Sequence, residues 1–288
     1  MSDSPELVLD SKSVLGEGAI WHAAARLLYW IDIEPGLVHV YDPKTKANRT
    51  LKMGQQVGTI VPRTSGGAMV ALKDGFAALD LGLGKLELWS DPEAHLTSNR
   101  FNDGKCDPSG RFWAGTIGKD PGGLYRLDKD RSVHKMFGGV KVSNGIAWSR
   151  DRKTMYYIDT PTMEVAAWDY DDATGNISNR RVAITVPKEN AYPDGSTLDA
   201  DGNLWVAHWD GWSVTCYDPN TGKQIRKIPM PVQRVTSVAF GDDDLGTMYI
   251  TSASIGLKPD ELGKQPHAGG LFRFRPGVKG LPAPEYAG

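Results

Sequence analysis

The chain has 288 residues, of which 40% are hydrophobic and 24% are charged, and its formal net charge is −2. This composition is typical of a globular protein that is large enough to bury a substantial core. It excludes the basic stripe expected of a nucleic-acid-binding surface, and no stretch approaches the roughly 18 apolar residues of a membrane span.

Cysteine usage and the N-terminal residues indicate the compartment. The two cysteines, Cys106 and Cys216, are too few for a disulfide framework and lack the spacing of a metal site. The opening stretch MSDSPELVLD has neither the basic nor the apolar region of a secretory signal. We therefore expect a cytoplasmic protein with reduced thiols.

A strand-like pattern recurs six times along the chain. Each copy has a small turn and then an apolar, aromatic run, and the runs are anchored at Leu28, Met69, Phe112, Met155, Leu204 and Met248. The steps between anchors are 41, 43, 43, 49 and 44 residues. Runs rich in Trp, Tyr, Val and Ile and bounded by Gly, Asp, Ser or Asn are typical of β-strands.

Further short apolar runs flank each anchor run, such as GIAWS before it and LVHVYDP after it. A period of about 40–50 residues with roughly four strands per repeat is typical of a β-propeller. The pattern predicts an all-β, six-bladed β-propeller that forms one domain over residues 1–288. We expect residues 6–11 to pair with residues 270–275 in the sixth blade, since this closes the ring without an open sheet edge.

A column of polar residues precedes the anchors by ten to twelve positions. Its six members are Glu17, Gly58, Asn102, Asn144, Asp194 and Thr236. Equivalent positions on the innermost strands of a propeller converge on one channel. Four of the six members carry side-chain carboxylate or amide oxygens.

Two interpretations of this column compete. Asn-Gly and Asp-Gly are common turn dipeptides, so each position taken singly can be an ordinary turn. Four oxygen donors in one register favour a site instead, because two carboxylates buried near one axis need a compensating cation. An oxygen-only ligand set suits Ca²⁺, Mg²⁺ or Mn²⁺ better than a thiolate-type zinc site.

A second polar column lies four residues after the anchors and consists of Asp32, Lys73, Thr116, Asp159, His208 and Ser252. We expect these residues to border the same opening, with a solvated strand end as the alternative interpretation. The sequence has no Gly-x-Ser-x-Gly elbow, no His-Glu-x-x-His motif and no P-loop.

Four motifs resemble those of the regucalcin/gluconolactonase family of sugar lactonases. They are Leu15-Gly16-Glu17-Gly18-Ala19-Ile20-Trp21, Arg100-Phe101-Asn102-Asp103-Gly104-Lys105, Ser143-Asn144-Gly145-Ile146-Ala147-Trp148-Ser149 and Tyr192-Pro193-Asp194-Gly195. They occur in order over nearly the whole chain.

The resemblance implies a six-bladed propeller with one divalent metal in its channel. It assigns Glu17, Asn144 and Asp194 as metal ligands, with Asn102 as a fourth ligand or a substrate contact. It also assigns Arg100 and Asn102 to substrate hydroxyls and Asp194 to general-base catalysis.

Two departures from the family pattern affect specificity. Ala19 stands where many members have proline, and the segment 116–123 is short where many have a longer loop. Asp120 is the candidate for the substrate-contacting acid found there in some members, and Lys119 is the alternative.

The resulting hypothesis is an enzyme that hydrolyses a sugar lactone, such as gluconolactone, to its aldonic acid, with no nucleic-acid or membrane partner and as a monomer or weak homodimer. The cofactor is one divalent metal among Ca, Mg, Mn, Zn and Fe, with Ca favoured. An organophosphate or other ester hydrolase and a non-enzymatic calcium-binding propeller are the alternatives.

Overall fold

The computed structural model describes residues 4–288; residues 1–3, which begin the stretch inspected for a secretory signal, lie outside the described residues. The described chain contains 22 β-strands, two short 3₁₀ helices, η1 (Thr160–Thr162) and η2 (Lys188–Asn190), and one α-helix, α1 (Pro259–Lys264). No helix in this part of the chain is long and apolar enough to cross a membrane.

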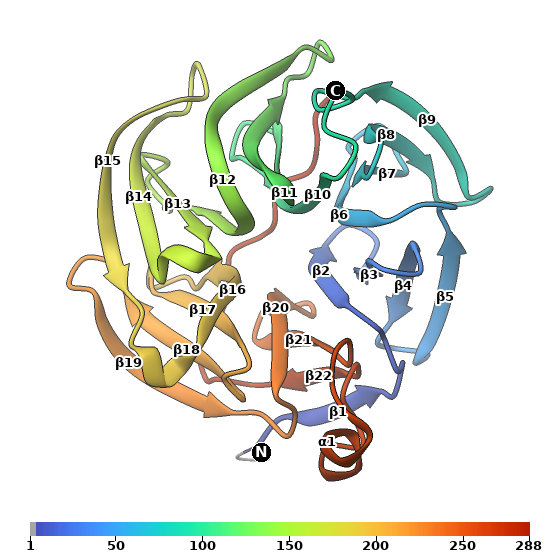
Figure 1. Ribbon diagram of the computed structural model, residues 1–288, viewed down its shortest axis with the longest axis vertical. Coiled ribbons are helices and arrows are strands. Elements are labelled where there is room, and N and C mark those ends of the chain that lie inside the picture. Colours follow the sequence, from blue (N-terminus) through green and yellow to red (C-terminus); the bar gives the residue numbers. More distant parts are fainter. Residues whose placement is uncertain (1–3) are drawn as a thin grey trace.

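The strands form antiparallel sheets arranged around a central axis (Figure 1). The first sheet contains β2 (Gly16–His22), β3 (Leu27–Asp32), β4 (Leu37–Asp42) and β5 (Ala47–Lys52). The second contains β6 (Val57–Pro62), β7 (Ala68–Leu72), β8 (Gly75–Asp80) and β9 (Lys85–Ser90).

The largest sheet contains β10 (Arg100–Cys106), β11 (Phe112–Leu127), β12 (Val133–Trp148), β13 (Thr154–Asp159), β14 (Glu164–Asp171) and β15 (Asn176–Thr185). The next contains β16 (Tyr192–Leu198), β17 (Leu204–Trp209), β18 (Ser213–Asp218) and β19 (Lys223–Pro229). The last has the order β1 (Glu6–Leu9), β22 (Leu271–Phe274), β21 (Thr247–Ala253) and β20 (Arg234–Gly241), so the N-terminal strand is hydrogen-bonded to β22.

The prediction of a closed ring of six separate blades is wrong, because the strands form five sheets, four with four strands and one with six. The difference arises in β12, a strand of 16 residues. Its residues 133–142 pair with β11 and its residues 143–148 pair with β13. One unbroken strand therefore belongs to two ladders, and two of the six sequence repeats merge into a single sheet. The fold is an all-β propeller of five sheets.

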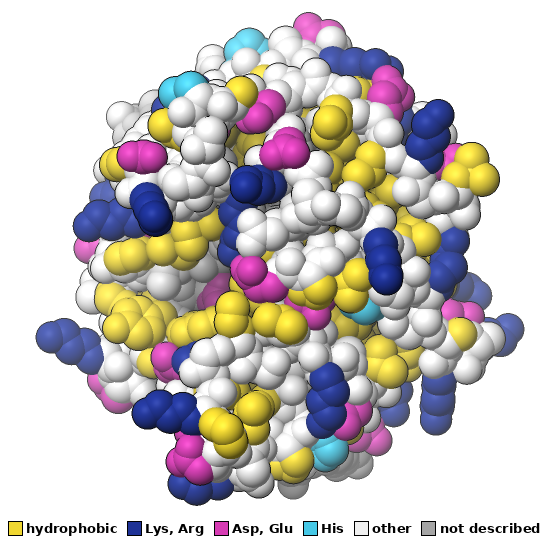
Figure 2. Space-filling view, turned by 45° about the vertical axis from the view of Figure 1, so that its right-hand side comes forward, with side chains coloured by type: hydrophobic (Ala, Val, Ile, Leu, Met, Phe, Trp, Pro, Cys, Tyr) yellow, Lys and Arg dark blue, Asp and Glu magenta, His cyan; other side chains and the backbone are white. Residues whose placement is uncertain are grey.

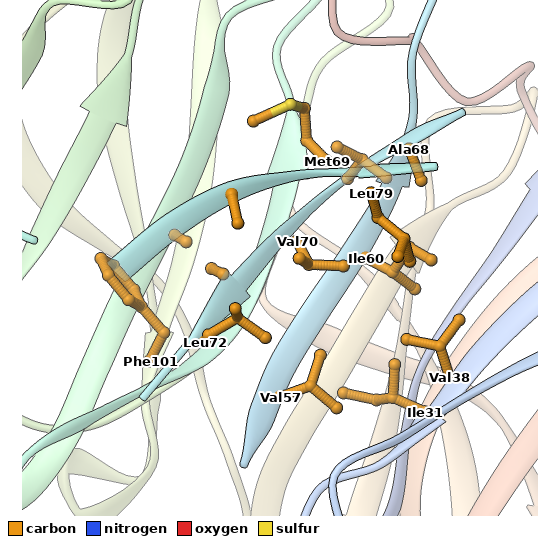
Figure 3. Packing of buried hydrophobic residues seen from close by; sticks show 14 of the residues in the cluster. Ile31, Val38, Val57, Ile60, Ala68, Met69, Val70, Leu72, Leu79 and Phe101 are labelled. Carbon is orange, nitrogen blue, oxygen red and sulfur yellow. The ribbon is translucent and has the colours of Figure 1, made fainter. Parts of the chain in front are cut away.

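Burial falls from the axis outward within the four-stranded sheets. All six anchor residues lie at the start of strands, and β7, which contains one of them, is buried along its whole length. Outer strands such as β5 and β9 are mostly exposed because one of their faces meets solvent. Ile31, Val38 and Phe101, from the neighbouring sheets, pack against the sheet β6–β9 (Figure 3), so the core lies between adjacent sheets.

Two hairpins share an aspartate–tryptophan bracket. In the β10–β11 connection, buried Asp107 accepts hydrogen bonds from the Arg111 backbone N–H (2.9 Å) and from the indole Nε1–H of Trp113 (2.9 Å). In the β16–β17 connection, Asp199 accepts the equivalent bond from the indole of Trp205 (2.9 Å). The carboxylate thus closes the turn and satisfies a buried indole at once.

The C-terminal segment 279–288 ties separate sheets together at the back of the ring, where it is drawn in red in Figure 1. Ala200 donates its N–H to the carbonyl of Lys279 (2.7 Å), and Tyr286 donates to Pro62 (2.8 Å). Because Tyr286 is fully buried, this segment is anchored by packing as well as by hydrogen bonds.

Candidate active site

The four predicted ligands lie on innermost strands of different repeats: Glu17 on β2, Asn102 on β10, Asn144 on β12 and Asp194 on β16. All four side chains are buried, with 4–6% of their surface exposed. Each lies where the register between the innermost strand and its neighbour shifts. Such bulges re-aim side chains and are common beside active sites. The interpretation of these dipeptides as ordinary turns is therefore wrong, because they lie within strands.

The two other members of the column, Gly58 and Thr236, support the strands that carry the predicted ligands. Gly58 lies at the bulge of β6, and a Cβ there would stand 2.3 Å from the carbonyl oxygen of Phe101. Only glycine lets β6 approach the strand that carries Asn102 this closely. Thr236, on β20, donates a hydrogen bond of 2.5 Å to the carbonyl of Gly16, next to Glu17. Both residues support the site without supplying a ligand.

Glu17 and Asp194 form a buried carboxylate pair. Burial and then the neighbouring Asp103 carboxylate raise the pKa of Glu17. Burial and then the charge of Glu17 raise the pKa of Asp194 well above its ordinary value. The two acids therefore resist ionising together unless positive charge compensates them.

The nearby cations balance only part of this charge. Lys105 is close enough to act on Glu17 and Asp103, and its ammonium donates to the Ser196 carbonyl. The Arg100 guanidinium also acts on Glu17. Arg100 is also shared with Glu34, whose carboxylate lies 3.9 Å from the guanidinium, so the two cations do not fully offset Glu17, Asp103 and Asp194. In Figure 2, acidic side chains gather in a recess near the centre of the face, beside basic side chains and bordered by hydrophobic ones.

The amide of Asn102 is held in one orientation by its neighbours. Arg100 Nη1 donates to Asn102 Oδ1 (2.7 Å), while Asn102 Nδ2 donates to the Ser143 carbonyl (2.7 Å). A guanidinium can only donate and a carbonyl can only accept, so the oxygen and nitrogen of the amide cannot exchange places. The same Nδ2 lies 3.3 Å from Asn144 Oδ1, which joins the two predicted amide ligands.

These contacts fit a divalent cation. Asp194 Oδ1 and Asp103 Oδ2 are buried without a hydrogen-bond partner in the described chain. A buried carboxylate oxygen without a donor is costly, and a cation would satisfy it. No group of three or more His, Cys, Asp or Glu residues with metal-binding geometry occurs in residues 4–288. The predicted ligand set has only two carboxylates and draws its other oxygens from amides.

Asp120, the predicted substrate contact, lies at the surface. It is exposed on β11 and accepts a hydrogen bond from Ser98 (3.2 Å), and no hydrogen bond or ion pair of the described residues connects it to the four predicted ligands. The segment 116–123 is part of β11, whose register with β12 shifts between Ile117 and Gly122.

The second polar column has mainly structural contacts. Asp32 accepts the backbone N–H groups of Val14 (2.9 Å) and Leu15 (2.8 Å). Asp159 accepts the N–H of Val142 (2.8 Å) in the equivalent place of another repeat. His208 is fully buried, with Nε2 at 3.3 Å from the Tyr217 hydroxyl. Asp32 and His208 are therefore not solvated strand ends.

Asp103 and Lys105 are the charged residues of the site that the sequence reasoning did not select. Both lie in the motif around Asn102; Asp103 is buried and Lys105 is half-buried. The sequence feature that could have identified them is the presence of two opposite charges at alternate positions of an innermost strand. Alternate residues of a strand point to the same face, which predicts a pair.

The described chain also has a separate cavity of about 250 Å³ at the other end of β2. Its lining is mixed: it contains aromatic and proline side chains such as Trp21 and Pro282, and also basic side chains that include Lys105.

Comparison with known proteins places this chain in a family. The family model described as the SMP-30/Gluconolactonase/LRE-like region matches residues 15–254, which include all four predicted ligands. Regucalcin of Oryctolagus cuniculus is 40% identical over 293 residues and 98% of each chain is covered. The Bacillus subtilis protein named "Putative sugar lactone lactonase YvrE" is 40% identical over 286 residues, again with 98% of each chain covered.

Solved structures share the fold over nearly the full length. A luciferin-regenerating enzyme superposes with a TM-score of 0.91 at 33% identity, covering 99% of this chain and 100% of that one. A calcium-binding protein, regucalcin from Agrobacterium tumefaciens strain C58, superposes with a TM-score of 0.93 at 27% identity, covering 98% and 97%. On these matches, the chain belongs to the SMP-30/gluconolactonase/LRE-like family.

Proposed function

We propose that the protein is a lactonase that hydrolyses a sugar lactone to its aldonic acid with the help of one divalent cation. The observation that carries the proposal is the buried Glu17–Asp194 pair, in which Asp194 Oδ1 has no partner in the described chain. The name of one relative, "Putative sugar lactone lactonase YvrE", supports the reaction class, and the description of another as calcium-binding supports the cation.

Glu17, Asn102, Asn144 and Asp194 are the residues that would hold the cation. When bound, a divalent cation supplies Lewis-acid polarisation of the lactone carbonyl and stabilises charge that develops on its oxygen. Ca²⁺ is favoured because carboxylate and amide oxygens are the ligands that this hard ion prefers.

Asp194 is the proposed general base. Its carboxylate takes a proton from the attacking water as the water oxygen bonds to the carbonyl carbon. The ring C–O bond then breaks, and the departing oxygen takes the proton that Asp194 removed from the water, which yields the hydroxyl group and restores the carboxylate. Arg100 and the amide of Asn102, already locked together at 2.7 Å, would bind hydroxyls of the substrate and orient its ring.

A non-enzymatic calcium-binding role is the second candidate, because the same acidic cluster would bind a cation without any reaction. Fold alone does not separate the two, since propellers host many functions. The two candidates differ in one measurable respect: only the first predicts turnover that disappears with the metal and returns with it.

The test uses the full chain after chelation with EDTA. Ca²⁺, Mg²⁺, Mn²⁺ or Zn²⁺ is returned singly, and a panel of pentono- and hexonolactones is assayed by pH-stat. We expect turnover of at least one lactone that depends on the returned metal, and a large loss in Glu17→Gln. The matched control is Glu87→Gln, at an exposed glutamate on β9. Metal binding without lactone turnover under any of these conditions would support the binding role and reject the lactonase.

A further inference from the structure

We propose that Thr160 is a positioning residue that sets the orientation of the Asn144 amide and thereby presents its oxygen to the metal site. The inference rests on the proposed function, since it takes Asn144 as a ligand. Thr160 has no place in the sequence motifs, and its role follows from two hydrogen bonds that join different sheets.

Thr160 begins η1, directly after β13, and lies between two innermost strands. Its half-buried hydroxyl accepts a hydrogen bond from Asn144 Nδ2 on β12 (2.8 Å). The same hydroxyl donates to the carbonyl oxygen of Pro193 on β16 (2.8 Å). Pro193 immediately precedes Asp194, so one side chain connects the backbone beside the proposed base to the amide of another proposed ligand.

The direction of these bonds is dictated by chemistry. A carbonyl oxygen can only accept, so the single hydrogen of the Thr160 hydroxyl is committed to Pro193. The hydroxyl oxygen then has only lone pairs to offer Asn144, and it can pair with the NH₂ group of the amide but not with its oxygen. The amide oxygen is consequently left on the other side, where it lies 3.3 Å from Asn102 Nδ2.

Asn102 provides an internal comparison. Its amide is oriented by Arg100 and by the Ser143 carbonyl, both at 2.7 Å, with no contribution from Thr160. Loss of the Thr160 hydroxyl should therefore leave the Asn144 amide held only by the long 3.3 Å contact from Asn102 Nδ2, while Asn102 stays in place. The defect expected is one misoriented ligand rather than a collapsed site.

Thr160→Val is the informative change because valine matches threonine in shape and lacks the hydroxyl. Without it, the Asn144 amide can turn its NH₂ group toward the cation, and Pro193 loses its donor. Groups that orient metal ligands typically change metal affinity or activity by about 10–100-fold when they are lost. We expect Thr160→Val to weaken Ca²⁺ binding by a factor in this range, and Thr160→Ser, which keeps the hydroxyl, to bind within about threefold of the unmodified protein.

The experiment titrates EDTA-stripped protein with Ca²⁺ by isothermal calorimetry and records thermal unfolding of each metal-free variant. Thr162→Val is the matched control, because Thr162 lies in the same turn and donates only to the Asp159 carbonyl (2.7 Å). We expect the control to bind Ca²⁺ like the unmodified protein. Lactone turnover is measured in parallel.

Repeating the Thr160→Val change in a protein that also carries Asn144→Asp tests whether the effect comes from the orientation of the Asn144 amide. In Asn144→Asp, both terminal atoms are oxygens, so no orientation of the side chain places an NH₂ group at the metal. We expect Thr160→Val to weaken Ca²⁺ binding by less than about threefold in this background, against a tenfold or greater loss with Asn144. This comparison stays valid if Thr160→Val lowers stability, because the same loss of packing occurs with Asn144 and with Asn144→Asp.

The outcomes separate the two proposals. Absence of both metal binding and turnover in the unmodified protein rejects the proposed function. Unmodified protein that binds Ca²⁺, together with a Thr160→Val variant that binds equally well, overturns the positioning role alone. An equal loss in Thr160→Val and Thr160→Ser overturns it too, as does an equal effect of Thr160→Val with and without the Asn144→Asp change.

Discussion

Bulges on the innermost strands decide which side chains meet at the axis. Glu17, Asn144 and Asp194 each precede a glycine, and in each case the register shift falls at that dipeptide. An added residue in one strand bends it and turns the side chain at the bend. Asp32 lacks this feature, and its carboxylate is engaged by backbone N–H groups instead.

Asp194 has two proposed roles, general base and metal ligand, and one substitution can distinguish them. Asp194→Asn retains an oxygen that can bind a cation but cannot take a proton from water. We expect kcat for lactone hydrolysis to fall by about 10²–10⁴-fold, while Ca²⁺ affinity changes less. Steady-state kinetics and calorimetry on the same preparation measure the two effects.

The control for this change is Asp243→Asn, at an exposed aspartate paired with Arg26 on the surface. It should keep both turnover and metal affinity. Near-normal turnover in Asp194→Asn with metal present would show that another group accepts the proton.

The aspartate–tryptophan bracket shows how one hairpin is held in its turn. Asp199 is fully buried, and it accepts bonds from the Asp201 and Asn203 backbone N–H groups and from the Trp205 indole. The identical spacing recurs at Asp107 and Trp113 in another repeat. The bracket therefore stabilises the connection between an innermost strand and its neighbour.

Removal of one bracket should destabilise the protein measurably. Asp199→Ala leaves the buried indole N–H of Trp205 without its acceptor, and an unsatisfied buried polar group costs about 1–3 kcal/mol. We expect the free energy of unfolding in urea to fall by this amount or slightly more. Asp201→Ala, at an exposed residue of the same turn, should have little effect. Equal stability of both variants would contradict the role given to the bracket.

Acid sensitivity is a property of the whole fold, and buried histidines contribute to it. His39 stacks on Trp30 with ring centroids 3.9 Å apart, and its Nδ1 lies 3.0 Å from the Thr50 hydroxyl. Its Nε2 is buried without a hydrogen-bond partner in the described chain. Burial lowers the pKa of His39 from 6.5 to about 4.

The sign of the effect follows from proton binding. Between pH 6.5 and about 4, the unfolded chain binds a proton at His39 and the folded chain does not. The free energy of unfolding therefore decreases as the pH falls through this window, by roughly 1.4 kcal/mol for each unit of the pKa difference. Above pH 6.5 this contribution is fully present.

His39→Asn removes the titration and keeps an acceptor for Thr50. We expect its stability to be lower at pH 8, where a stacking partner of Trp30 is lost, but to depend less on pH between 6.5 and 4. Urea unfolding at several pH values measures the slope. A slope equal to that of the unmodified protein would exclude His39 as a source. His208, whose pKa burial lowers to about 3, is the next histidine to test.

The repeat period predicted an all-β propeller, because strand-forming runs and the turns that bound them depend on residues close together in the sequence. It could not predict the number of sheets. A count of repeats assumes a break between neighbouring blades, whereas β12 runs unbroken from one ladder into the next and joins two repeats. Whether a strand ends or continues depends on partners distant in sequence.

The four candidate ligands were visible as a column in the sequence, because residues in equivalent positions of a repeat point to a common axis. Their partners were not visible. Lys105 donates to Ser196, and Thr160 connects Asn144 with Pro193. The sequence separations between these residues do not follow the repeat period. Asp120 was predicted from the short segment 116–123, and its exposed carboxylate accepts a hydrogen bond from Ser98. Periodicity is a property of the chain and identifies the strands and the column, whereas the contacts that orient each side chain exist only after the sheets pack around the axis.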